Sequence, residues 1–173
     1  VEQNVRDSRI ACIYEGTTGI QALDLLGRKI LGTKGERLRK YTKKIHKFCE
    51  ANIDNPVLNE FVTELQKYNK EWGELVMKVG GSAMQNPDEL GAASVDFLMY
   101  SGYLVLGFYW AQAVAVADKK LKEGTTEEDF YNAKITTARF FFQRMLPKTR
   151  GYVATMNTGA ANLMDLDAEH FSF

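Results

Sequence analysis

The chain has 173 residues, of which 45% are hydrophobic and 12% aromatic, so it can bury a core and is not a disordered tail. Its 22 basic residues are balanced by 22 acidic ones, which argues against nucleic-acid binding, because such proteins usually carry a basic excess. The length suits one domain, or one domain with a small neighbour.

Apolar residues recur three or four positions apart through most of the chain, which is the spacing of helices that bury one face. The spacing predicts five main helices at about 18–31, 35–53, 57–84, 88–122 and 126–145, with a shorter one near 148–164. No hairpin turn between short alternating strands interrupts them. Long helices joined by short loops form antiparallel bundles, so we predict an all-α, antiparallel helical bundle.

Helix starts are marked by prolines and by capping residues. Asn55-Pro56 and Asn86-Pro87 each place a cap residue before a proline at the first helical position. Pro147 also lies where a helix can begin, and Thr125–Glu128 has the pattern of a capping box.

The most basic run is "KGERLRKYTKKIHK", residues 34–47. Its charge pattern favours the solvated face of a helix. Binding of phosphate or of another polyanion is the alternative.

The stretch from Phe97 to Ala117 contains no charged residue, and its 21 positions could span a bilayer, which needs about 20. Small and polar residues interrupt it, however, and its tyrosines lie through the middle rather than only at the ends, unlike an aromatic belt. We therefore expect a central helix buried all round by its neighbours, with no membrane span. A contact between subunits is compatible with this expectation.

The two cysteines, Cys12 and Cys49, are far apart and form no CxxC motif, which predicts free thiols in a reducing, cytoplasmic compartment. The two histidines, His46 and His170, are isolated as well. With no cluster of cysteine and histidine, we expect no metal site.

The segment from Asp7 to Gln21, "DSRIACIYEGTTGIQ", resembles the "D-x-R-I-x-x-I-Y-E-G-T-x-x-I-Q" segment of acyl-CoA dehydrogenases. In that family the segment lies near the end of the dehydrogenase part. The stretches "FLMYSGYLVLGFYWAQAVAVADKKL", "FYNAKITTARFFFQRMLP" and "GAANLMDL" further resemble the helical C-terminal extension of a longer subgroup, similar to 3-methylmercaptopropionyl-CoA dehydrogenase. The resemblance implies a division into the end of the dehydrogenase helical domain, 1–34, and the extension, 35–173.

The resemblance also implies the roles of five neighbouring residues. Glu15 would be the catalytic base, Gly16 would touch the substrate, and Thr17, Thr18 and Gly19 would touch FAD. Removing a proton next to a thioester needs a carboxylate whose pKa is raised by a dry pocket, and Ile13, Tyr14 and Gly16 around Glu15 suit such a pocket. Without the resemblance, Glu15 could be only a first-turn carboxylate that favours the helix dipole, with Thr17 as the cap.

The implied reaction is α,β-dehydrogenation of an acyl-CoA, with hydride transfer to FAD and reoxidation by an electron-transferring flavoprotein. The resemblance also implies a homo-oligomer, a dimer by expectation. Because the chain begins with Val and offers no strand domain, we expect it to be part of a longer enzyme and, alone, to bind no FAD and to be inactive. The alternative function is a stand-alone helical interaction or oligomerisation module that retains the motif without flavin chemistry.

Overall fold

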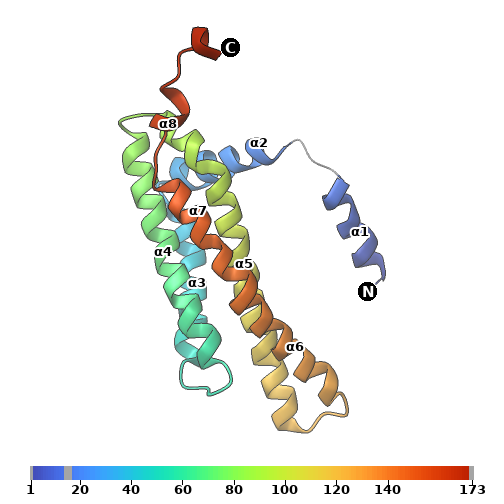
Figure 1. Cartoon of the computed structure of the whole chain (residues 1–173). Coiled ribbons are helices and arrows are strands. Elements are labelled where there is room, and N and C mark those ends of the chain that lie inside the picture. Colours follow the sequence, from blue (N-terminus) through green and yellow to red (C-terminus); the bar gives the residue numbers. More distant parts are fainter. Residues whose placement is uncertain (1, 14–16, 172–173) are drawn as a thin grey trace.

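The computed structural model describes residues 2–13 and 17–171, and every regular element within them is a helix (Figure 1). The α-helices are α1 (Glu2–Ile13), α2 (Thr18–Leu23), α3 (Glu36–Asn52), α4 (Asn59–Ala83), α5 (Asp88–Glu123), α6 (Glu128–Phe140), α7 (Thr149–Met156) and α8 (Ala161–Met164). The predicted all-α fold is confirmed.

Helix α5 is the centre of the bundle. It packs against α4, α6, α7 and α2, while α3 packs on α4 (Figure 1). Helices α6 and α7 run back along α5, so that α4, α5 and this returning segment form an antiparallel arrangement. The bundle therefore joins segments from residue 18 to the end of α7 in one core.

Two helical runs contain wider and tighter turns that spacing alone did not predict. Helix α2 continues through a π-helical turn, Asp24–Ile30, and α6 continues through another, Phe141–Met145. A 3₁₀ turn at Leu146–Lys148 then leads into α7, so Pro147 lies inside a continuous helical path rather than at a clean start. Proline is tolerated there because it occupies the first positions of the tight turn.

Other boundaries also differ from the prediction. Helix α1 was not among the predicted helices, and the predicted helix 148–164 is two helices, α7 and α8, because Gly159 adopts a positive φ of 76° between them. Asn55 does cap its turn, since its Oδ1 accepts hydrogen bonds from the N–H groups of Val57 and Leu58. Helix α6 begins only at Glu128, and the Thr125 hydroxyl oxygen accepts a hydrogen bond from Glu127, so the predicted capping box is not formed.

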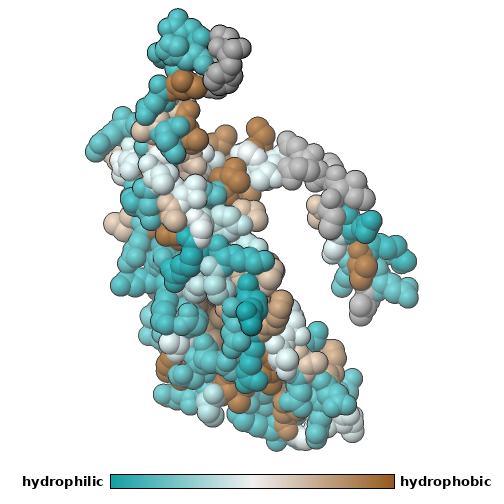
Figure 2. Space-filling view, viewed as in Figure 1, coloured by the Kyte–Doolittle hydropathy of each residue, from teal (hydrophilic) through white to brown (hydrophobic). Residues whose placement is uncertain are grey.

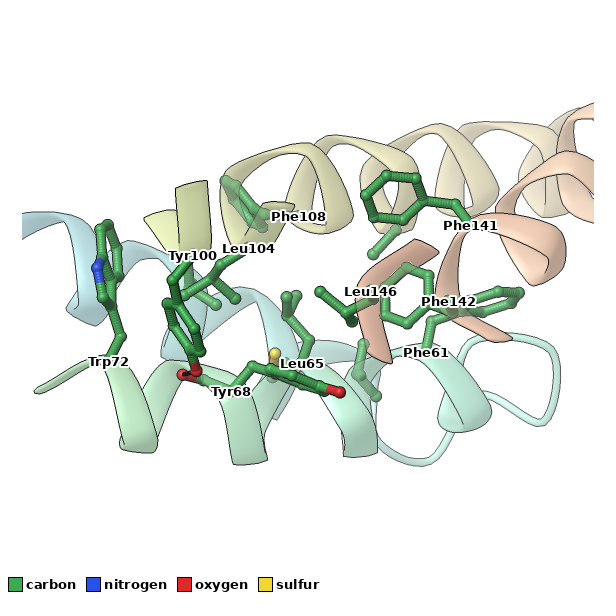
Figure 3. Close-up of a cluster of buried hydrophobic side chains, with 14 of the residues drawn as sticks. Phe61, Leu65, Tyr68, Trp72, Tyr100, Leu104, Phe108, Phe141, Phe142 and Leu146 are labelled. Carbon is green, nitrogen blue, oxygen red and sulfur yellow. Dashed lines mark hydrogen bonds between the residues drawn. The ribbon is translucent and has the colours of Figure 1, made fainter. Parts of the chain in front are cut away.

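Large side chains from α4, α5 and the α6–α7 segment fill the core (Figure 3). Tyr100, Leu104 and Phe108 of α5 are fully buried. On the other elements the labelled core residues of Figure 3 are Phe61, Leu65, Tyr68, Trp72, Phe141, Phe142 and Leu146. The indole N–H of Trp72 donates a 2.8 Å hydrogen bond to the Ser101 hydroxyl, which in turn donates to the Phe97 carbonyl at 2.7 Å. The core thus pairs these polar groups, as burial requires.

Helix α5 is long and apolar enough to cross a membrane, with a mean hydropathy of 1.3 over its most apolar window. It lies at the centre of the bundle, as predicted, but the expectation that it is buried all round is wrong. Only 39% of the most apolar 18-residue stretch of this helix is buried. Apolar residues such as Leu106 and Val116 are more than half exposed. The neighbouring helices cover one side of α5 and leave the opposite side open.

The basic run at 34–47 lies mostly on the exposed face of α3, whose buried positions are Leu38, Ile45 and Cys49. Two of its side chains pair within the helix, Lys40 with Glu36 and His46 with Glu50. The helix therefore has the amphipathic character that its charge pattern predicts.

Asp118 is a buried carboxylate that ties α5 to the loop between α3 and α4. Its Oδ2 accepts hydrogen bonds from the Asn55 amide at 2.8 Å and from the Lys122 ammonium at 2.6 Å. Burial alone would raise the pKa of Asp118, but these two hydrogen bonds outweigh it and hold that pKa below its ordinary value. The carboxylate therefore stabilises the fold in its charged form.

Replacing Asp118 with alanine is expected to lower the free energy of unfolding by about 1–3 kcal/mol at pH 7, because the Asn55 amide loses its acceptor. The folded-state pKa is the lower one, so the stabilisation is present above the unfolded pKa of about 3.9 and is lost as the pH falls through the folded value. Urea unfolding across this range would measure it. The exposed Asp54→Ala control should stay within about 0.5 kcal/mol of the parent. If the parent and Asp118→Ala differ in their free energy of unfolding by the same amount in acid as at pH 7, the charged carboxylate is not the source of the stabilisation.

Candidate functional site

Three of the five residues that the motif singles out lie at the start of α2. Thr17 precedes the helix, and its carbonyl accepts a 2.8 Å hydrogen bond from the N–H of Gln21. Its side chain makes no capping hydrogen bond, so the structure does not support Thr17 as a side-chain cap. Glu15 and Gly16 lie outside the described residues.

Thr18 and Gly19 form the first turn of α2. Thr18 is half-buried and Gly19 is exposed, and a Cβ added at Gly19 would meet no heavy atom within 4 Å. A ligand could therefore approach the backbone closely at Gly19. The N-terminal end of a helix also presents N–H groups that suit polar or anionic groups.

The helical run that carries these residues is anchored in the bundle. Ala22, Leu26 and Ile30 are buried, and the run packs against α5. On its exposed side Ile20 is 68% exposed and Leu23 43%. The C-terminal end of the motif is thus part of a helix that is anchored in the core. The outer face of that helix is apolar and exposed.

A cluster of charges follows the motif within the same run. Asp24 accepts hydrogen bonds from Arg28 and pairs with Lys29 at 2.9 Å. These two partners, Arg28 first, lower the pKa of Asp24 to about 2. The carboxylate is therefore neutralised by its own helix rather than poised to take up a proton.

None of the hollows described among residues 2–13 and 17–171 is lined by Thr17, Thr18 or Gly19. A hollow of about 470 Å³ lies next to α2 at Leu23, between the start of α5 and α8. A larger one, of about 810 Å³, lies between α3 and α4, and a third, of about 450 Å³, lies between α3, α5 and the Asp24–Ile30 turn. The structure brings the three residues together at the start of α2 but does not enclose them.

Sequence reasoning missed a polar cluster that joins α4, α5 and α7. The hydroxyl of buried Tyr100 donates toward the Glu71 carboxylate at 2.8 Å and lies 2.9 Å from the Tyr68 carbonyl. Arg150 donates to the other oxygen of Glu71 at 2.8 Å and lies over the Tyr68 ring. Burial and the neighbouring Glu71 raise the pKa of Tyr100. Because Arg150 neutralises Glu71 and the phenol stays protonated, the cluster acts as a structural tie between helices.

One group within the described part of the chain could hold a metal ion, formed by Asp167, Glu169 and His170. All three residues are exposed and lie near the C-terminus. Exposed acidic groups of this kind are common without a metal, so the cluster carries no functional assignment.

Comparison with known proteins identifies related sequences over the whole chain. The family described as acetyl-CoA dehydrogenase C-terminal like matches residues 41–167. The broad-specificity linear acyl-CoA dehydrogenase FadE5 of Mycobacterium tuberculosis is 34% identical over 182 aligned residues, covering 99% of this chain and 29% of that protein.

Two further relatives are similar. The 3-methylmercaptopropionyl-CoA dehydrogenase of Ruegeria pomeroyi is 35% identical over 147 residues, which cover 84% of this chain and 25% of that protein. A butyryl-CoA dehydrogenase of Syntrophomonas wolfei is 28% identical over 169 residues, covering 96% of this chain and 28% of that protein. The chain thus spans less than a third of the length of the curated relatives it matches.

Proposed function

Because the chain belongs to the acetyl-CoA dehydrogenase C-terminal like family, we propose that it is the C-terminal part of a flavin-dependent acyl-CoA dehydrogenase. The observation that carries the proposal is the alignment of 99% of this chain with 29% of a relative that is named as an acyl-CoA dehydrogenase. That alignment includes the segment from Asp7 to Gln21, which lies before the family match.

The proposed reaction removes two hydrogens from an acyl-CoA thioester to give the enoyl-CoA. Glu15 takes the proton from the carbon next to the thioester carbonyl, and Gly16 lets the substrate approach the backbone. FAD, when bound, supplies the acceptor for the hydride that leaves the next carbon.

The described residues fit a role beside such a cofactor. Thr17 offers an exposed hydroxyl, Gly19 leaves its backbone open, and both lie at the start of a helix anchored in the core. We propose that Thr17, Thr18 and Gly19 contact polar or anionic groups of FAD.

The division of the chain at residues 34 and 35 is also a proposal. Lys34 and Gly35 both adopt a positive φ, 51° and 74°, so the backbone turns sharply between the helical run that starts with α2 and α3. The run nevertheless buries Leu26 and Ile30 in the common core, so the two parts share their packing.

The partners are proposed on the same basis: an acyl-CoA substrate, an electron-transferring flavoprotein as oxidant, and a second copy of the protein in a homodimer. We propose a cytoplasmic location. We propose no nucleic-acid partner, because the 22 basic residues of the sequence are balanced by 22 acidic ones.

The test is a visible absorption spectrum of the native polypeptide that carries this sequence, isolated from its source and titrated with a panel of acyl-CoAs. A flavin band that bleaches with one of them is the expected result, and it would name the substrate class. A colourless polypeptide no longer than this chain would overturn the proposal in favour of the alternative, a helical interaction module.

The isolated 173-residue chain is expected to bind no FAD and to show no turnover. The reason is that Thr17 and Gly19 are exposed and do not line the three hollows described above. Gel filtration after incubation with FAD, followed by an assay with acyl-CoA and an artificial electron acceptor, measures both. The full-length parent is the positive control, and retained flavin or turnover by the isolated chain would refute the expectation.

A further inference from the structure

Helix α5 carries an uninterrupted apolar stripe on the side that faces away from the bundle. The α5 stripe consists of Val95, Met99, Gly102, Leu106, Tyr109, Ala113 and Val116. The exposed fractions of its large side chains run from 38% at Met99 to 56% at Val116. At 1.5 Å per residue the stripe is about 32 Å long.

An outward helix face of this kind is normally polar, since it meets water. The stripe instead has no charged residue, because none occurs between Phe97 and Ala117. The face of the molecule in Figure 2 offers a contrast, since it is largely hydrophilic over α4. An exposed apolar strip of this length indicates a contact with another protein surface.

The spacing of the stripe indicates what kind of surface fits it. Successive members are four, three, four, three, four and three residues apart, a mean of 3.5, which is the repeat that keeps one helix seam facing another helix. The buried residues of α5, including Tyr100, Leu104 and Phe108, lie on the opposite side. The stripe is therefore a second, unused packing seam of the same helix.

We propose that the α5 stripes of two copies of this chain pack against each other, antiparallel and centred on Leu106. Turning the stripe end for end about Leu106 places large residues opposite small ones: Met99 faces Ala113 and Tyr109 faces Gly102. At the ends Val95 faces Val116. A surface that matches its own reverse in this way is what a twofold-symmetric interface requires.

The structure provides room for the largest of these side chains. Gly102 lines the hollow of about 450 Å³, together with apolar residues that include Tyr41, Trp72 and Val105. A Cβ at Gly102 would meet nothing within 4 Å. The ring of Tyr109 is 53% exposed and packs beside Phe108 of its own chain, and in the proposed pairing it faces this hollow of the partner.

The charges at the two ends of α5 favour the antiparallel direction. Asp88 and Glu89 lie in its first turn, whereas its last turns carry Lys119, Lys120 and Lys122 against Asp118 and Glu123, which leaves one net positive charge. Antiparallel copies bring the acidic end of one helix near the basic end of the other, whereas parallel copies would place like charges together. Because the stripe is uncharged, no like charges meet along its length.

The inference gives a surface to the homodimer proposed above, and it rests on that part of the proposed function alone. Flavin chemistry has no part in this contact, so the experiment measures disulfide cross-linking between two chains rather than enzyme activity. A failed cross-link would leave the dehydrogenase proposal standing, and a colourless parent would leave the interface standing.

Single cysteines test both the contact and its direction. Cys12 is first replaced by serine, while Cys49 can remain, since it is fully buried and burial raises the pKa of its thiol to about 11. Under mild oxidation, Leu106→Cys is expected to form a disulfide-linked dimer. Met99→Cys alone should not, because the two copies of this position lie about 21 Å apart along the seam, but mixed with Ala113→Cys it should give a heterodimer.

A charge variant gives an independent reading by analytical ultracentrifugation. Leu106→Glu is expected to weaken self-association about tenfold or more, since it buries a charge at the centre of the seam. Met77→Glu, at an apolar residue of α4 that is 80% exposed, is the matched control and should leave the association unchanged.

Two results would overturn the proposal. Equal cross-linking of all single-cysteine variants would indicate parallel or unspecific association. A strictly monomeric chain without a Leu106→Cys cross-link would mean that another surface, such as the rest of a longer parent, covers the stripe. Circular dichroism of each variant would verify that its helices are intact.

Discussion

Replacing Phe108 with alanine is expected to lower the free energy of unfolding by about 3–5 kcal/mol, a large part of the stability of a domain of this size. Phe108 is fully buried on α5, and its ring meets those of Tyr41 and Phe48 edge to face at centroid distances of 6.2 and 5.5 Å. The ammonium of Lys44 lies over the same ring, 5.7 Å from its centre. Truncation would leave a cavity between α3 and α5 that rigid helices cannot close.

Chemical denaturation followed by circular dichroism measures the loss. Phe140→Ala is the matched control, because the same side chain is removed from a position that is 58% exposed, and its effect should stay within about 0.5 kcal/mol. Similar losses for the two variants would mean that Phe108 is not a core residue in solution.

The second large effect concerns catalysis by the full-length parent. Replacing Glu15 with glutamine is expected to lower kcat by about 10²–10⁴-fold, the contribution typical of a positioned general base. Glutamine keeps the size of the side chain but cannot accept the proton. Stopped-flow bleaching of the flavin band by the acyl-CoA that reduces the parent protein measures this step directly.

Two controls separate a missing base from a damaged site. The variant should retain its flavin band and should still bind the substrate, since neither requires the carboxylate. Glu36→Gln, at an exposed residue in the first turn of α3, should bleach at the parent rate. Normal bleaching by Glu15→Gln would assign the proton transfer to another residue.

Most of the fold could be predicted because its helices bury regular faces. The spacing of Phe61, Leu65, Tyr68 and Trp72 on α4 is a strong signal for one amphipathic helix, and all four residues are buried. Spacing does not reveal where a helix widens or tightens, so the joints between α6 and α7 were not foreseen. Helix α1 escaped prediction because its described side chains are exposed and few of them are apolar.

Contacts between segments that are distant in the sequence could not be predicted. Glu71, Tyr100 and Arg150 meet only because α4, α5 and α7 pack together, and no spacing in the sequence links them. The uncharged stretch in α5 was expected to be wholly buried, and this was wrong. Composition does not show how many neighbours a helix has. The motif around Glu15 remains a prediction, because its base lies outside the described residues.

The packing of α2 on α5 has a consequence for the order of synthesis. A ribosome makes residues 17–33, which carry the predicted cofactor contacts, well before it makes α5. Until α5 arrives, Leu26 and Ile30 can pack only against the helices already made, although both are buried in the finished bundle. The helical run that starts with α2 is therefore secured by helices that are translated after it, and we expect α5 to complete the folding of the residues that precede it.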